Sequence, residues 1–248
     1  MKLTELLDYT GQLLQVDRYR DYCPNGLQVA GRDEIGTIVS GVSASMELLV
    51  AAANAGADLV LVHHGYFWKG EDPCVVGIKR TRLKFLLASD INLVAYHLPL
   101  DAHPTLGNNA QLAQRLGLQM DGTFGDQAIA AYGALTQPMS LEDLGRRVAD
   151  ALGRSPLVVG EADKRIGRVA WCTGAAQDYL EQAVQFGVDA FITGEVSERT
   201  VHLARESGVA FIGAGHHATE RYGVQALGEH LAQRFGIKHQ YIEIDNPV

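Results

Sequence analysis

The feature that most constrains the fold of this chain is an internal repeat. Residues 35–64 align without a gap on residues 166–195 at a constant offset of 131, and Asp58 falls on Asp189. Similarity at a fixed offset indicates structural repetition. The repeat therefore predicts two similar lobes, which we expect to divide at residues 126 and 127 (first lobe 1–126, second lobe 127–248).

A second repeated segment carries polar residues. At an offset of 119, His97 falls on His216 and Asp101 falls on Glu220, so that H-x-x-x-D and H-x-x-x-E occupy the same slot in the two copies. Each motif follows an apolar strand pattern and precedes a helix pattern. This shared slot predicts that both lobes place a histidine and a carboxylate after a strand.

The hydrophobic pattern predicts an α/β fold, with the order α-β-β-α-β-α-β-α occurring twice. The solid apolar run 59–62 is typical of a parallel strand that is buried on both faces. Ser45 is expected to cap the helix that follows it. Further strands are expected at 27–29, 37–42, 91–96, 129–135, 157–159, 169–172, 190–193, 209–212 and 239–244, and further helices at 78–88, 108–117, 140–152, 176–186 and 197–207.

Composition restricts the class of protein. The chain has 248 residues, is 47% hydrophobic and 20% charged, and carries a net charge of −8 without a basic block. Nucleic-acid binding through phosphates is therefore not expected. Three scattered cysteines argue against a disulfide framework. Because the N-terminus has no leader pattern and no apolar run is long enough for a membrane span, we expect a cytoplasmic protein with no membrane contact.

The notable polar residues lie where strands end, which is where parallel α/β sheets bind ligands. They are His63, His64, His97, Asp101, Glu195, His216 and Glu220. Imidazole and carboxylate without thiolate suit Fe, Mn, Zn or Ni. Because the candidate ligands outnumber those of one catalytic zinc, two metals are expected, and Glu220 could bridge them.

Local geometry refines these expectations. His63 and His64 are adjacent, so they can reach one cleft only where the backbone turns at the strand end. His216 and Glu220 share a helix face at i and i+4. Pro99 disfavours helix at the preceding residue. His97 and Asp101 are therefore expected to line a loop, with Asp101 as the better ligand and His97 behind the ligands or acting as a general acid or base.

Simpler readings stay open for single residues. His97 alone could be a hydrogen-bonded structural histidine, and Glu195 could simply cap the next helix. One of the neighbours His216 and His217 is expected to be a bystander. The remaining histidines are expected to be loop or solvated positions: His103, His202, His230 and His239.

Other motifs are rejected. Residues 213–218 fit G-x-G-x-x-A, but too little chain follows for a dinucleotide-binding domain, and an imidazole sits where the backbone should approach a pyrophosphate. No phosphate loop of the type G-x-x-x-x-G-K-[ST] and no G-x-S-x-G motif occurs.

Taken together, the motifs resemble those of the Nif-three-like family, whose bacterial members are often called GTP cyclohydrolase I type 2 homologues. The motifs, which span the chain, are P-N-G-L-Q-V at 24–29, H-H-G-Y-F-W at 63–68, H-L-P-L-D at 97–101, I-T-G-E at 192–195 and G-H-H-A-T-E at 215–220. The chain is closest to the short bacterial type that lacks a middle insertion. Many relatives have Thr-Asn where this chain has Leu98-Pro99.

The resemblance implies two intertwined lobes with mixed sheets in α/β/α layers and a dinuclear metal site. The implied ligands are His63, His64, Asp101, His216 and Glu220, with Glu220 bridging two divalent ions whose identity (Fe, Zn or Mn) stays open. It also implies a ring-shaped homohexamer with the metal sites facing an internal cavity.

Three functions are compatible with these observations. The first is a metal-dependent hydrolase of the GTP cyclohydrolase type, or one acting on another nucleotide or phosphoester, in which a metal-bridging hydroxide attacks a small-molecule substrate and His97 or Glu195 moves the proton. The alternative is a non-enzymatic metal-binding or scaffold protein. Redox chemistry at a di-iron site is a third, weaker option.

Overall fold

The computed structural model describes residues 1–248 and has a mixed α/β fold. The chain forms two compact units. The first unit comprises Met1–Gly107 and Gly223–Asp245, and the second comprises Asn108–Tyr222 and Asn246–Val248. The chain thus leaves the first unit, builds the second, and returns, which gives the expected intertwining of the two lobes.

Each unit contains one sheet and its covering helices. The elements of the first unit are α1 (Leu3–Leu14), η1 (Val16–Arg18), β1 (Gly26–Val29), β2 (Thr37–Ser43), α2 (Met46–Asn54), β3 (Leu59–His64), α3 (Gly77–Ser89), β4 (Asn92–Ala95), α4 (Leu98–Ala102) and β11 (Lys238–Tyr241). Those of the second are α5 (Asn108–Leu116), β5 (Leu118–Phe124), η2 (Asp126–Ala128), β6 (Ala130–Ser140), α6 (Leu141–Leu152), β7 (Leu157–Val159), β8 (Arg165–Cys172), η3 (Gln177–Tyr179), α7 (Leu180–Val184), β9 (Ala190–Thr193), α8 (Glu198–Ser207) and β10 (Ala210–Gly213). Helix α9 (His216–Phe235) starts in the second unit and belongs to the first from Gly223 onward.

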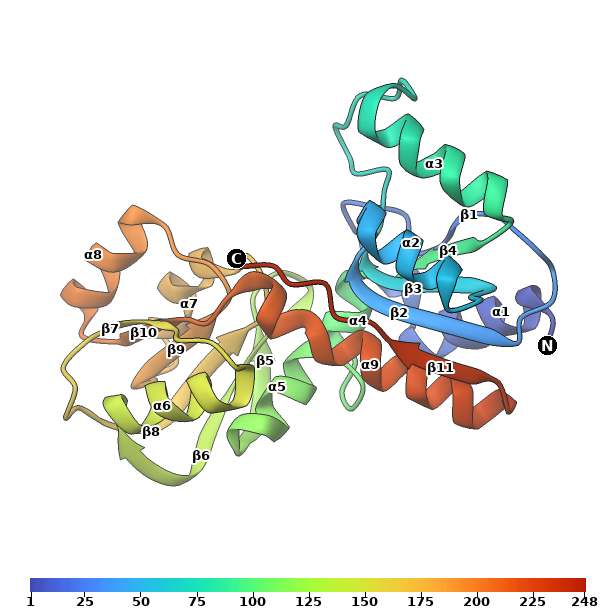
Figure 1. Ribbon diagram of the computed structural model, residues 1–248. Helices are drawn as coiled ribbons and strands as arrows, with labels where there is room; N and C mark the ends of the chain where they lie inside the picture. The colour runs from blue at the N-terminus through green and yellow to red at the C-terminus, as the bar shows by residue number, and fades with distance from the viewer. The chain divides into compact units, whose positions relative to one another are not determined.

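The first sheet has the strand order β1-β4-β3-β2-β11, with β1 antiparallel and the other strands parallel. Successive side chains of a strand point to opposite faces. Val39 and Val60 therefore pack with apolar residues of α2 and α3, whereas Ile38 and Leu61 pack with residues of α1 and α9. The result is an α/β/α sandwich, which can be followed in Figure 1.

The second sheet has the order β5-β6-β8-β9-β10-β7, in which only β8, β9 and β10 run parallel. One face buries Trp171 and Ile192 against leucines and valines of α5 and α6. Phe191 and Phe211 belong to the alternate positions, and their ring centroids lie 6.2 Å apart. Helices α7 and α8 cover that other face (Figure 1).

The two sheets confirm the internal duplication. The parallel strands β4-β3-β2 correspond to β10-β9-β8, and an antiparallel strand flanks each set, β1 beside β4 and β7 beside β10. Asp58 accepts hydrogen bonds from the backbone N–H groups of Gly36 and Thr37 at 2.8 and 2.9 Å. Asp189 does the same for Gly167 and Arg168, at 2.8 Å each. The repeated aspartate thus holds the start of the first parallel strand in both copies.

The units differ from the lobes expected to divide at residues 126 and 127. The structure assigns α5 and β5 to the second unit, because β5 pairs with β6 along Leu118–Phe124. It also assigns the later part of α9 and β11 to the first unit, since β11 pairs with β2. β5 is an edge strand with mainly exposed side chains, so it lacks the apolar pattern that would predict a strand.

The segment after His97 also differs from expectation. Leu98–Ala102 forms the short helix α4 rather than a loop. Pro99 occupies the first turn, where its missing N–H costs no intrahelical hydrogen bond. None of the helices combines the length and the apolar composition that crossing a bilayer requires.

Candidate functional site

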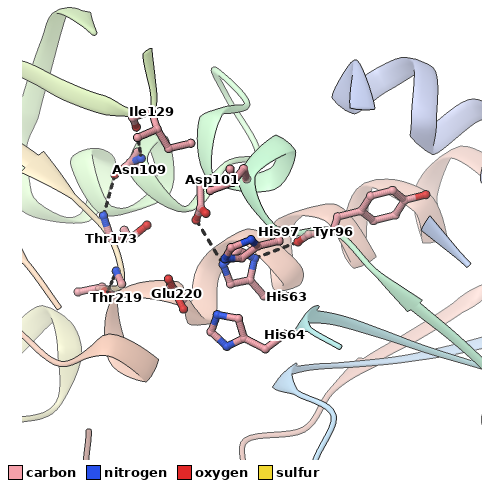
Figure 2. Close-up of polar contacts among 12 residues, drawn as sticks. His63, His64, Tyr96, His97, Asp101, Asn109, Ile129, Thr173, Thr219 and Glu220 are labelled. Atoms are coloured by element: carbon pink, nitrogen blue, oxygen red, sulfur yellow. Dashed lines mark hydrogen bonds and ion pairs between the residues drawn. The ribbon is translucent and has the colours of Figure 1, made fainter. Parts of the chain in front are cut away.

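Four side chains gather at the carboxyl ends of β3 and β4 in the first unit. These residues, the first donor set, are His63, His64, His97 and Asp101. The ring centroid of His63 lies 4.6 Å from that of His64 and 5.0 Å from that of His97. β3 and β4 are neighbouring parallel strands, so their carboxyl ends meet at one edge of the sheet. The adjacent histidines do converge, as expected at a strand end (Figure 2).

His63 is fully buried. Its Nδ1 lies 2.9 Å from the carbonyl oxygen of Tyr96. Because a carbonyl only accepts, Nδ1 carries a proton. Nε2 lies 3.4 Å from Oδ1 of Asp101, as Figure 2 shows. A lone pair and a carboxylate oxygen attract each other only when a proton or a cation lies between them. This arrangement fits a metal ion bound by both residues.

Asp101 lies on α4 and is only 5% exposed. Its backbone N–H donates to the carbonyl of His97 at 3.1 Å, which closes the first turn of the helix. His97 and Asp101 therefore belong to one helical turn. The prediction that Pro99 keeps them in a loop is wrong, because the proline is placed where a helix tolerates it.

His64 lies at the last position of β3 and is half-buried. Its Nδ1 lies 3.1 Å from the hydroxyl oxygen of Ser43, at the end of the neighbouring strand. Its ring centroid is 6.0 Å from that of Trp68. Trp68 follows the histidine pair in the sequence, and its ring lies beside that of His64.

His97 is held by a residue that sequence reasoning missed. Its Nδ1 lies 2.7 Å from Oδ1 of Asp21, a buried carboxylate in the loop before β1. Burial raises the pKa of Asp21, but hydrogen bonds and charge from His97, together with the Asn25 amide, outweigh it and lower the pKa to about 2. Asp21 lies in a polar loop without a strand or helix pattern, two residues before Cys23. The sequence therefore contains no signal that it contacts His97.

The second unit brings together three predicted residues, the second donor set: His216, Glu220 and Glu195. Nε2 of His216 lies 3.1 Å from Oε2 of Glu220, one helical turn along α9. Nδ1 of His216 lies 2.7 Å from Oε1 of Glu195, which follows β9. Burial lowers the pKa of His216, but the hydrogen bonds and charges of Glu220 and then Glu195 raise it to about 9.

Glu195 is therefore a partner of a histidine rather than a simple helix cap. A carboxylate that accepts from the second ring nitrogen is the usual companion of a metal-binding histidine, because it fixes the ring orientation. The cap of α8 is made by Ser197 and Thr200 instead. The predicted alternative role of Glu195, as the cap, is wrong.

Gly174 makes room for the carboxylate of Glu220, which is 3% exposed. A Cβ at Gly174 would overlap Oε1 of Glu220 and lie 3.3 Å from Nε2 of His216. The backbone there is further held by Thr219, whose Oγ1 accepts from the N–H of Gly174 at 3.0 Å. This supporting glycine carries no recognisable motif, and sequence reasoning missed it.

The other histidines take different contacts. His202 pairs with Glu198 on the exposed face of α8, as expected for a solvated position. His230 contacts the hydroxyl of Tyr9 at 2.7 Å, and His239 contacts that of Ser40 at 2.8 Å, so these two are hydrogen-bonded rather than simply solvated. The remaining two are His103, whose Nδ1 accepts from Leu106 N–H, and His217, which is buried on α9.

The donor chemistry of both sets is imidazole nitrogen and carboxylate oxygen. Such donors suit Fe, Mn or Zn, and the absence of thiolate distinguishes them from a structural zinc site. Cys23 lies within reach of Asp21 and His97. However, burial, together with the charge of Asp21, raises the pKa of its thiol to about 12, so Cys23 is poorly suited to act as a thiolate ligand.

Comparison with known proteins agrees with the fold and the motifs. The family model described as "Duf34/NIF3 (NGG1p interacting factor 3)" matches residues 1–247. A Pseudomonas aeruginosa protein named "GTP cyclohydrolase 1 type 2 homolog" is 58% identical over 99% of this chain and 98% of its own length. A solved structure of protein ybgI, described as of unknown function, has a TM-score of 0.96 at 51% identity, with full coverage of both chains.

A crystal structure of a protein from Thermus thermophilus extends this likeness. It has a TM-score of 0.91 at 34% identity, again over the whole of both chains. Full coverage in each direction confirms the short type without a middle insertion. By its sequence, its paired sheets and its strand-end residues, this chain belongs to the Duf34/NIF3 family.

Proposed function

We propose that this protein is a metal-dependent hydrolase that uses two divalent ions, either iron, zinc or manganese. The observation that carries the proposal is the buried pair His63 and Asp101, in which Nε2 of His63 lies 3.4 Å from a carboxylate oxygen of Asp101. The second donor set supports it, since the carboxylates of Glu220 and Glu195 flank both nitrogens of His216.

The proposed ligands are drawn from both units. His63, His64 and Asp101 would act together with His216 and Glu220, with Glu220 as the bridging carboxylate. When bound, divalent ions supply positive charge that polarises a scissile bond and lowers the pKa of water.

The other residues would orient and move protons. Glu195 accepts from Nδ1 of His216 at 2.7 Å and would keep Nε2 of that ring available as a ligand. His97, whose ring lies beside His63 and His64, would take up and return the proton of the attacking water. We expect Glu195 to contribute mainly through ligand orientation and His97 through proton transfer.

The substrate class is proposed from the relatives. Their name, GTP cyclohydrolase 1 type 2 homolog, favours a nucleotide, and a purine nucleoside triphosphate heads the panel to be tested. A net charge of −8 disfavours anionic substrates at long range, but bound cations invert that preference locally.

Turnover of a nucleotide and phosphoester panel by the metal-loaded protein tests the proposal. His64→Ala and Glu220→Ala should abolish any metal-dependent turnover. His202→Ala is the matched control, because His202 is exposed and pairs with Glu198 across one turn of α8. Absence of metal-dependent turnover on the whole panel, or turnover that survives in both ligand variants, would count against a hydrolase.

A second candidate function is a scaffold whose metals serve stability, and one surface favours it. Val75, Val76 and Ile78 are 48, 63 and 72% exposed, which is unusual for three apolar residues so close in sequence. The family description also contains the words "interacting factor". We propose that this surface supports a homo-oligomer, with a ring-shaped hexamer as the expected state.

Light scattering on the wild type and on Ile78→Asp tests the proposed oligomer, whereas partner binding and thermal melts test the scaffold role. The scaffold proposal predicts a hexamer that Ile78→Asp dissociates, together with partner binding that survives Glu220→Ala. A monomeric wild type would contradict the proposed oligomer. A metal-free protein with the same melting temperature as the metal-loaded protein would contradict a stabilising role of the metals.

A further inference from the structure

Asp21 is a carboxylate near the first donor set whose two oxygens both accept hydrogen bonds. Its Oδ1 accepts from Nδ1 of His97 at 2.7 Å and from the N–H of Tyr22 at 2.6 Å. Its Oδ2 accepts from the Asn25 amide at 2.8 Å and from the N–H of Leu98 at 2.9 Å. The side chain is 3% exposed. Four donors occupy both oxygens, so little capacity is left for a metal ion.

This arrangement fixes the orientation of His97. Since Asp21 is an ionised acceptor, the proton of the short contact lies on Nδ1 of His97. The backbone N–H of His97 donates to Oδ1 of Asn25 at 2.7 Å. Trp68 packs edge-on against the imidazole, with centroids 5.1 Å apart and planes at 88°. The loop at 21–25 therefore holds both the backbone and the ring of His97.

We propose that Asp21 is a positioning residue that holds His97 as the Nδ1–H tautomer and presents its Nε2 beside His63 and His64 as a proton acceptor. The inference rests on the proposed hydrolytic function. It assigns a role to Asp21, which is neither a proposed metal ligand nor a proposed proton carrier. A carboxylate behind a histidine sets the tautomer and stabilises the imidazolium that forms during proton transfer.

In the hydrolytic step that this arrangement serves, His97 carries one proton from water to the leaving group. The oxygen of water forms a bond to the carbon or phosphorus of the substrate, and its proton passes to Nε2 of His97. The electron pair of the breaking bond stays on the leaving group, which then takes the proton back from Nε2. Asp21 keeps its charge throughout and holds the Nδ1–H.

Two other roles predict different results. If His97 were a metal ligand, its Nε2 would couple to the metal nucleus. If Asp21, Cys23 and His97 bound a metal of their own, the Nδ1–H would be absent and the metal content would depend on Cys23.

The test is NMR of the full-length chain with isotopically labelled histidine, loaded with zinc and, separately, with cadmium. His97→Gln assigns the His97 signals. We expect a protonated Nδ1 and an unprotonated Nε2 at His97 in the wild type, with no coupling to cadmium. Asp21→Ala and the nearly isosteric Asp21→Asn should both shift His97 toward the Nε2–H tautomer, because neither variant keeps a carboxylate that accepts from Nδ1–H.

Asp17→Asn is the matched control, since Asp17 is an exposed carboxylate in η1, four residues before Asp21, and it should leave the His97 signals unchanged. If Asp21→Ala fails to fold, the wild-type tautomer and Asp21→Asn carry the test. An Nε2–H tautomer in the wild type, a cadmium coupling at His97, or an unchanged tautomer in folded Asp21→Ala would overturn the inference. None of these readouts uses turnover, so failure of the hydrolase proposal would be seen separately.

Discussion

Gly174→Ala should damage the second donor set far more than it damages the fold. Gly174 has φ +70°, a left-handed conformation in which an L-residue costs about 1–2 kcal/mol. Gly208 has φ +71° and open space around its missing Cβ. Gly208→Ala should therefore melt about 2–8 °C below the wild type in EDTA, given about 2–4 °C per kcal/mol for a chain of this size, and Gly174→Ala should lose at least as much.

Only Gly174→Ala adds a steric effect. Its Cβ would overlap Oε1 of Glu220 and lie 3.1 Å from Cδ, so the carboxylate must rotate away from Nε2 of His216. Disturbing the surroundings of a metal ligand weakens metal affinity by about 10- to 100-fold. At an ion concentration of about 100 times the wild-type Kd, binding stabilises the protein by about 2.7 kcal/mol, and about 1.3–2.3 kcal/mol of this gain should disappear.

The assay is a pair of thermal melts, with EDTA and with zinc, together with calorimetric titration of zinc. The expected pattern is a normal zinc-induced rise in Tm for Gly208→Ala and a strongly reduced rise for Gly174→Ala. Equal zinc affinities of the two variants would refute the reasoning that Gly174 provides the space for Glu220.

Two further predictions concern the duplication and the protonation of the site. Asp58→Ala and Asp189→Ala should each lower the free energy of unfolding by about 3 kcal/mol or more, because each removes two charge-assisted hydrogen bonds to backbone N–H groups; urea unfolding measures this, and a variant as stable as the wild type would contradict the shared role. In the metal-free protein, the raised pKa of His216 contributes stability that is complete below pH 6.5 and is lost as the pH rises through about 9. Thermal melts in EDTA across this range should show the loss, Glu195→Gln should reduce it, and a wild type that is equally stable at both ends would argue against the His216 contacts.

Much of the fold could be predicted from local patterns. The solid apolar runs identified the parallel strands, since strands buried on both faces must be apolar throughout. The repeated Asp58 and Asp189 indicated the duplication, and the structure explains why both copies keep an aspartate there. The unit boundary could not be read in the same way, because the return of α9 and β11 to the first unit depends on pairing of β11 with the distant strand β2.

Residues of the candidate site could be predicted only where a side chain able to bind metal lies at the end of a predicted strand or at the start of a predicted helix. His63, His64 and His216 stand directly after or at the start of patterned elements, so their position in the fold was accessible. Asp21 lies in an irregular loop, and its contact with His97 joins residues 76 positions apart. Gly174 acts by lacking a side chain, which leaves no chemical signature in the sequence.

The α4 helix shows the limit of a single-residue rule. Pro99 disfavours the helical conformation at the residue before it by a steric clash. Here Leu98 is the first helical residue, and the N–H of Leu98 is satisfied by Asp21. A remote carboxylate thus supports a helix start that local preference alone argues against.

The central proposal is that ligands of both units bind two metal ions together, and metal content tests this proposal most directly. Elemental analysis of the purified, metal-loaded chain should find two divalent ions per chain in the wild type and in His202→Ala. His64→Ala in the first unit and Glu220→Ala in the second should each lose metal. Full metal content in either of these two variants would contradict joint binding by the two donor sets.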